Sequence, residues 1–221
     1  MAGPDRGLSE LLKWSIENTP AADGNNTSSA DRAPASRLNP EVIAALFGGP
    51  SDAELMQAAM GVITSTDPGV SLDDKLTAFD NLEQLIESLD NANNLAKLSL
   101  WTPLLGMLEH DERELRKMAA WCVGTAVQNN EPSQERLLAM GGIPALVGLA
   151  TAGDEHLDVR RKAIYALSSA VRNYQPAMDA AAEELAKKGR EAGKIDARNM
   201  DAVDDLINGL KEETKEKATA A

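Results

Sequence analysis

The chain has 221 residues and is short of aromatic residues, which make up 3% of it, and it contains a single cysteine. Few aromatics together with abundant Ala and Leu favour closely packed helices over a β-sandwich, and 43% hydrophobic residues suffice for a core. The lone Cys122 cannot form an internal disulfide. It lies in an apolar helical stretch, so we expect a buried small hydrophobe in a protein of a reducing compartment.

Long apolar runs and an excess of basic residues are also missing. No run approaches the roughly 20 residues that span a bilayer, and the start MAGPDRGLSELLKW lacks the apolar core of a signal peptide. The formal net charge is −13, which repels phosphate backbones and acidic lipid surfaces. We therefore expect a cytoplasmic protein with no nucleic acid or membrane as its partner.

The sequence offers no motif for catalysis. The string GGPSD at 48–52 lacks the lysine of a phosphate-binding loop, and no cysteine pair or HExxH spacing could hold a metal. The two histidines, His110 and His156, fall near predicted helix–helix turns, where surface or capping roles are expected. We predict a protein that is not an enzyme and needs no cofactor.

An internal repeat runs through the second half of the chain. The string ELRKMAAWCVGTAVQNNEP at 114–132 aligns without gaps with DVRRKAIYALSSAVRNYQP at 158–176, an offset of 44 residues. The prolines Pro103 and Pro144 give a spacing of 41. A period of about 40 to 44 residues is typical of armadillo and related helical repeats. The predicted fold is all-α, an armadillo-like right-handed helical solenoid with a flexible N-terminal extension, whose third helices line the concave side.

This repeat and the composition suggest five segments. We predict an amphipathic segment at 1–19 and a disordered linker at 20–37. N-terminal capping helices are predicted at 38–91, two armadillo-like repeats at 92–176, and C-terminal helices with a tail at 177–221.

Several helix boundaries follow from capping signals. A helix is predicted to start at Asn39-Pro40-Glu41 and to end at the Gly-Gly-Pro of 48–50, and a second one follows Asp52. A third opens at Ser71 with a capping box and runs unbroken over 72–91. Another repeat would bring a Gly-Ile-Pro corner near residue 188, where the chain has KKGREAGKI instead, and KEETKEKATAA is expected to be a frayed end.

The two long repeat helices have a buried and an exposed side. Their buried side is predicted to consist of Leu115, Ala119, Cys122, Val123, Ala126 and Val127, and of Val159, Ala163, Ala166, Leu167, Ala170 and Val171. Their exposed side is predicted to consist of Trp121, Thr125, Gln128 and Asn129, and of Tyr165, Ser169, Arg172 and Asn173. A second interpretation is that the two aromatics pack between adjacent repeats. Armadillo proteins that hold extended peptides often have Asn where this chain has Thr125 and Ser169, so a folded partner is favoured.

Several strings resemble a known family. They are LLKWSIENT, NPEVIAALFGGPSDAELM, LIESLDNANNL, LWTPLL, AAWCVGTAVQNN and KAIYALSSAVRNYQP. Together they resemble the fungal armadillo-type nucleotide exchange factors of the seventy-kilodalton heat-shock chaperones, relatives of the animal Hsp-binding protein. The resemblance implies a co-chaperone whose concave face grips the ATPase domain of a cytosolic chaperone and speeds the release of ADP. A monomer is the default expectation for a solenoid of this shape. The alternative is an armadillo adaptor with no effect on nucleotide.

The resemblance also implies site residues. Those for the partner are Asp90, Asn91, Asn93, Asn94, Trp121, Gln128, Asn129, Tyr165, Arg172 and Asn173. The asparagines of LDNANN could instead cap a helix. Near the N-terminus the resemblance implies a segment that mimics the chaperone's client, with Leu11, Leu12, Lys13, Trp14 and Ile16. That segment could instead be an amphipathic helix docked on the solenoid.

Overall fold

The computed structural model describes residues 48–190 and 193–219, and in the last helix the side chains up to Lys215. The domain described below is the compact unit that begins at Ser51. Every regular element in the described part is a helix, so the all-α prediction is confirmed. The helix predicted to start at Asn39-Pro40-Glu41 lies outside the described residues.

Two capped helices open the domain, α3 (Asp52–Ile63) and α4 (Leu72–Ile86). Both start with a capping box, in which a serine hydroxyl accepts the backbone N–H three residues on and the acid there accepts the serine's own N–H. The box predicted at Ser71 and Asp74 is confirmed. The first box pairs Ser51 with Glu54, so α3 is capped one residue earlier than predicted.

The prediction of one unbroken helix over 72–91 is wrong. Helix α4 ends at Ile86, and a separate helix, α5 (Leu89–Lys97), begins after a two-residue break. The buried Asn91 explains the break. Its side-chain amide donates to the carbonyl of Leu85 at 3.0 Å and to Asp52 Oδ2 at 2.7 Å. These bonds satisfy a carbonyl in the last turn of α4 and fix the bend between the two helices.

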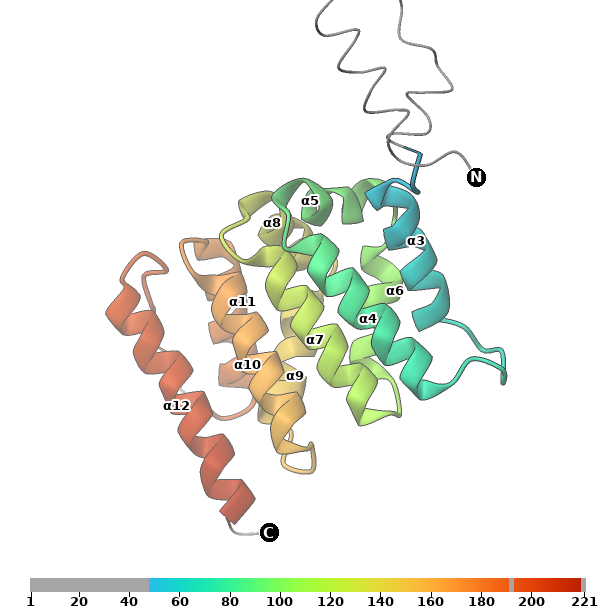
Figure 1. Cartoon of the computed structure of the whole chain (residues 1–221). Helices are drawn as coiled ribbons and strands as arrows, with labels where there is room; N and C mark the ends of the chain where they lie inside the picture. The colour runs from blue at the N-terminus through green and yellow to red at the C-terminus, as the bar shows by residue number, and fades with distance from the viewer. Residues whose placement is uncertain (1–47, 191–192, 220–221) are drawn as a thin grey trace, which may run out of the picture. The chain divides into compact units, whose positions relative to one another are not determined.

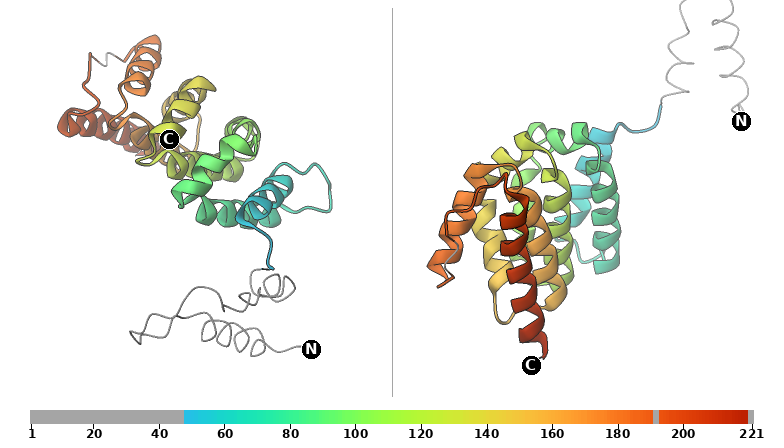
Figure 2. Two further views of the ribbon diagram at one scale, coloured as in Figure 1. Left: turned by 90° about the horizontal axis from the view of Figure 1, so that it is seen from above. Right: turned by 90° about the vertical axis from the view of Figure 1, so that its left-hand side faces the viewer.

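Two groups of three helices follow in the same order. The first group is α5, then α6 (Trp101–Gly106) with the short 3₁₀ turn η1 (Met107–Glu109), then α7 (Arg113–Val127). The second group is α8 (Glu131–Ala139), α9 (Gly142–Thr151) and α10 (Leu157–Val171). This succession of helices is the armadillo-like solenoid that the repeat predicted, and Figure 2 shows the groups following one another in chain order.

A third group has only its first and last helices, α11 (Gln175–Lys187) and α12 (Met200–Thr219). The connection between them takes the place of a second helix, in keeping with the missing Gly-Ile-Pro corner. The expectation of a frayed end is wrong for the stretch up to Thr219, which is helical. Helix α12 is anchored by buried side chains spaced three or four residues apart: Val203, Ile207, Leu210 and Thr214.

The last helix of each group packs beside that of the next, so α4, α7, α10 and α12 form one row (Figure 1). We call the solvent-facing side of this row the inner face. It is defined by partly or fully exposed residues of the four helices and of the segments that follow their C-terminal ends, namely Asp80, Glu87, Lys117, Trp121, Thr125, Gln128, Arg161, Tyr165, Arg172 and Asp204.

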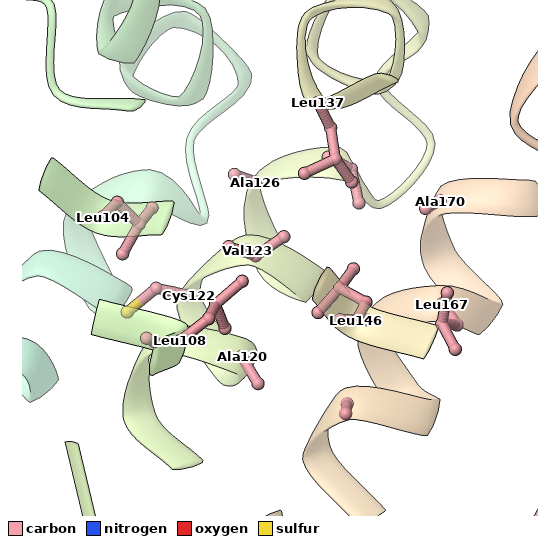
Figure 3. Packing of buried hydrophobic residues seen from close by; sticks show 14 of the residues in the cluster. Leu104, Leu108, Ala120, Cys122, Val123, Ala126, Leu137, Leu146, Leu167 and Ala170 are labelled. Atoms are coloured by element: carbon pink, nitrogen blue, oxygen red, sulfur yellow. The ribbon is translucent and has the colours of Figure 1, made fainter. Parts of the chain in front are cut away.

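The predicted core of the two long repeat helices is confirmed. All twelve residues predicted for it are at most 2% exposed. Small side chains let α7 and α10 approach closely, and Figure 3 shows Ala126, Val123, Leu146 and Ala170 within this packing. Cys122 is fully buried with its thiol 3.8 Å from the carbonyl oxygen of Phe79, and burial raises its pKa far above the usual range. It is the buried hydrophobe that was predicted.

A shared turn explains why both long helices end in Ala-Val, a polar residue and Asn. Gln128 and Arg172 are extended, with ψ of 115° and 129°, whereas Asn129 and Asn173 have positive φ of 52° and 60°. In each turn the carbonyl of the preceding valine accepts the N–H three residues on, at 3.3 Å. This is a type II turn, whose third residue must be Gly or Asn. The proline that follows lies in the first turn of the next helix.

Candidate partner-binding face

Neighbouring helices of the inner face are joined by side-chain contacts. Thr125 on α7 donates to Glu83 on α4 at 2.8 Å. Tyr165 on α10 donates from its hydroxyl to Gln128 on α7 at 3.2 Å. Further along the row, Arg172 on α10 forms an ion pair with Asp204 on α12. The polar residues of this face therefore connect adjacent repeats and also border the solvent.

The two aromatics of the face serve the packing between repeats. Trp121 and Tyr165 are half-buried, and Trp121 packs against the hydrophobic core. The Nζ of Lys162 lies 3.5 Å from the centre of the Trp121 ring and 5.7 Å from that of Tyr165. Burial lowers the pKa of Lys162. The negative charge of Glu83 works against this shift, and the like charge of Lys117 adds to it. Both aromatics thus take part in the packing between repeats, and each ring keeps part of its surface in solvent.

Two hollows of about 450 Å³ each mark the inner face. The first lies where α4, α5, α7 and α10 meet, and we call it the acidic hollow after Glu83 and Glu87. Gln128, Asn129 and Tyr165 also line it. The second lies between the N-terminal halves of α7 and α10 and the side of α4, and we call it the basic hollow. It is lined by Leu76, Asp80, Lys117, Met118, Trp121, Asp158, Arg161 and Lys162.

The residues of LDNANN belong to α5, which is not one of the four helices of the inner face. Asn91 is 7% exposed and holds α3, α4 and α5 together, so its role is the structural one. Asn93 accepts a long hydrogen bond of 3.4 Å from Ser133 on α8 and lines a different hollow. Asp90 is exposed and Asn94 is half-buried. The acidic hollow is reached from α5 by Leu89, which is 57% exposed, and by Ala92.

The remaining predicted residues lie at the C-terminal ends of α7 and α10. Gln128 and Asn129 are exposed and line the acidic hollow. Arg172 is engaged on three sides, by Ser168, the sulfur of Met200 and Asp204. Asn173 is exposed, and its backbone N–H donates to the carbonyl of Ala197 at 2.9 Å. The structure thus brings Gln128, Asn129 and Tyr165 together in the acidic hollow and places Trp121 in the basic hollow. Arg172 and Asn173 lie at the junction with α12.

Sequence reasoning missed several of the charged residues that line these hollows. Glu83, Lys117, Arg161 and Lys162 were not singled out, nor was Leu89. One signal was present in the sequence, because Lys117 and Arg161 occupy the same position of the two aligned repeats. The approach of Lys162 to Trp121 carried no such signal, since it depends on how α10 is placed against α7.

The predicted client-mimic residues Leu11, Leu12, Lys13, Trp14 and Ile16 lie outside the described residues. Within residues 48–190 and 193–219, no group of three or more His, Cys, Asp or Glu side chains could hold a metal ion. No helix in this same part of the chain has both the length and the apolar character to cross a bilayer.

The succession of helices and the row of inner helices define a helical-repeat protein of the armadillo type. Two family models cover most of the chain: nucleotide exchange factor Fes1 matches residues 8–95, and the SIL1/FES1/HPBP1 C-terminal domain matches residues 91–189. The Hsp70 nucleotide exchange factor FES1 of Gibberella zeae is 66% identical over 94% of this chain and 97% of that relative. The protein belongs to this family of Fes1-type exchange factors.

More distant relatives carry the same family name. The Hsp70 nucleotide exchange factor fes-1 of Neurospora crassa is 51% identical over 96% of this chain and 99% of that relative. The FES1 protein of Eremothecium gossypii is 45% identical over 77% of this chain and 57% of its own length. Helix α12 lies beyond the residues that the second family model matches.

Proposed function

We propose that this protein is a nucleotide exchange factor of a cytosolic Hsp70 chaperone and that it holds the chaperone's ATPase domain on its inner face. The observation that carries the proposal is family membership at 66% identity over nearly the whole chain, together with a hollowed face formed by one row of helices. The factor acts as a monomer in the cytoplasm, catalyses no covalent step and needs no cofactor.

The exchange follows from differential binding. A factor that binds the open form of the ATPase domain better than the closed form lowers the affinity for ADP by the same ratio. Moving that domain from mostly closed to mostly open needs roughly 5 kcal/mol of differential binding. No single contact supplies this, so the residues around both hollows share it. The ties between neighbouring repeats support the proposal, because a stiff face can impose its shape on a mobile partner.

The N-terminal segment is proposed to compete for the chaperone's peptide site. Leu11, Leu12, Trp14 and Ile16 around Lys13 give a short apolar stretch with a positive charge, which suits a client mimic. The sequence equally allows this segment to dock as an amphipathic helix on the domain that follows.

Release of fluorescent ADP from a fungal cytosolic Hsp70 tests the exchange. A faster release with this protein supports the proposal, and an unchanged rate leaves the adaptor function as the better account. Deletion of residues 1–19 should leave ADP release intact and slow the release of a bound peptide. A fall in ADP release would show that this segment belongs to the exchange machinery instead.

A further inference from the structure

The two repeats carry a basic residue at the same position, and both of these residues line the basic hollow. Lys117 on α7 and Arg161 on α10 are 44 residues apart, the offset of the repeat, and each lies one turn before an aromatic residue of the inner face. Lys162 adds a third cation from α10. The chain as a whole has 35 acidic and 22 basic residues, so a cluster of cations on this face runs against the general charge balance.

Other basic residues of these helices have structural partners. Arg116 donates to both oxygens of Glu155 at 2.6 and 2.9 Å, and the equivalent Arg160 is buried with its Nε on the carbonyl of Ala150. Lys117 and Arg161 take part in no hydrogen bond or ion pair within the described residues. Each repeat therefore has two adjacent basic residues with different surroundings. The first, Arg116 or Arg160, bonds to a neighbouring element, and the second, Lys117 or Arg161, lines the hollow.

The charge of Lys162 is only partly compensated within the protein. This side chain is partly withdrawn from solvent above Trp121, Glu83 offsets part of that cost, and Lys117 places a like charge near it. Asp80 and Asp158 line the same hollow but make no ion pair with the three cations. We expect a partner protein to supply the negative charges that this cluster of cations lacks in the free protein.

We propose that the basic hollow, through Lys117, Arg161 and Lys162, receives a patch of clustered carboxylates on the folded partner. This inference rests on the proposed function, in which that partner is the Hsp70 ATPase domain. The acidic hollow, with Glu83 and Glu87, lies at the other end of the same helices. The inner face therefore carries opposite charges at its two ends, which fixes the direction in which a partner of matching charge can dock.

Charge reversal at the basic hollow tests the inference. The double variant K117E/R161E should bind the ATPase domain at least about 10-fold more weakly, mainly through slower association, since like charges then face each other. Association of the wild type should also slow as salt is added, and that of the variant should lose this dependence. The charge-conserving variant K117R/R161K should bind within about 2-fold of the wild type.

The matched control is K97E/K188E, which changes net charge equally at two exposed lysines outside the inner face. If it weakens binding as much as K117E/R161E, or if K117E/R161E binds like the wild type, the inference is wrong. Capture of RNA or of anionic vesicles by the wild type, lost in K117E/R161E while ATPase-domain binding persists, would also overturn it. Wild type that fails to speed ADP release would instead refute the proposed function. Circular dichroism melting of each variant confirms that it is folded.

Discussion

The ring of Tyr165 occupies the space that a side chain at Gly124 would need. A β-carbon built on Gly124 would come within 2.5 Å of Tyr165 Cε1 and 3.1 Å of the Ala166 Cα. The two residues lie on the neighbouring inner helices α7 and α10, and the same tyrosine donates to Gln128. This contact sets the distance between adjacent repeats on the face that is proposed to bind Hsp70.

Gly124→Ala should therefore destabilise the protein although alanine favours helices. We expect a loss of about 1–3 kcal/mol in the free energy of unfolding, because the ring and the backbone of α10 must move apart. Urea denaturation followed by circular dichroism measures it. Gly148→Ala on α9 is the control, since nothing lies within 4 Å of its added β-carbon, and it should be neutral or slightly stabilising. Equal behaviour of the two variants would contradict the packing described.

Gln134 should be one of the most costly polar side chains to truncate. Its amide nitrogen donates to the carbonyls of Ser169, Ala170 and Arg172 at 2.9, 3.1 and 3.0 Å, and the side chain is buried. These carbonyls end α10 and would otherwise be unsatisfied. Gln134→Ala is expected to cost about 1–3 kcal/mol of stability in the same urea experiment. The exposed Gln57→Ala on α3 should change it by less than about 0.5 kcal/mol.

The pair of Arg116 and Glu155 should make stability depend on pH in mild acid. Burial alone would raise the pKa of Glu155, but hydrogen bonds from Arg116 and from the N–H of His156 lower it below its usual value. Its contribution is then complete above the unfolded pKa, about 4.3, and is lost as the pH falls through the lower folded pKa.

Glu155→Gln should cost about 1–3 kcal/mol at pH 7 and reduce the loss of stability on going from pH 5 to pH 3. Melting curves over this range measure both effects. The exposed Glu135→Gln should leave the profile as it is. A steeper acid dependence in Glu155→Gln than in the wild type would contradict the direction of the pKa shift.

Cys122 should resist thiol reagents in the folded protein. Burial raises the pKa of its thiol, so almost no thiolate forms at pH 8, and the sulfur is out of reach of solvent. A chromogenic disulfide reagent should react at the rate of global unfolding, and at once in denaturant. Immediate stoichiometric reaction of the native protein would show that the core opens at α7.

The repeat and its core could be predicted because both follow from the spacing of apolar residues along the sequence. An offset of 44 residues placed the buried side of α7 and α10 correctly, and the capping box at Ser71 fixed the start of α4. The break at residues 87–88 could not be foreseen, since apolar side chains continue with helical spacing across it. The bend is set by the bond between Asn91 and Asp52, 39 residues apart.

The end of the C-terminal helix was mispredicted for a different reason. The charged composition of residues 211–221 suggested a frayed end, yet the helix continues to Thr219, and its buried Thr214 continues the spacing of Val203, Ile207 and Leu210. The sequence placed only some of the candidate residues near one another. Gln128, Asn129 and Tyr165 line one hollow and Trp121 lines the other, whereas the LDNANN residues lie on α5 because the helix breaks before them.

The central claim is that the inner face, and not the opposite side of the solenoid, contacts the Hsp70 ATPase domain. A photo-crosslinking amino acid placed at Gln128, compared with one placed at Gly148 on α9, tests it most directly. The account predicts a crosslink to the ATPase domain from position 128 and none from position 148. A crosslink from position 148 with none from position 128 would contradict it.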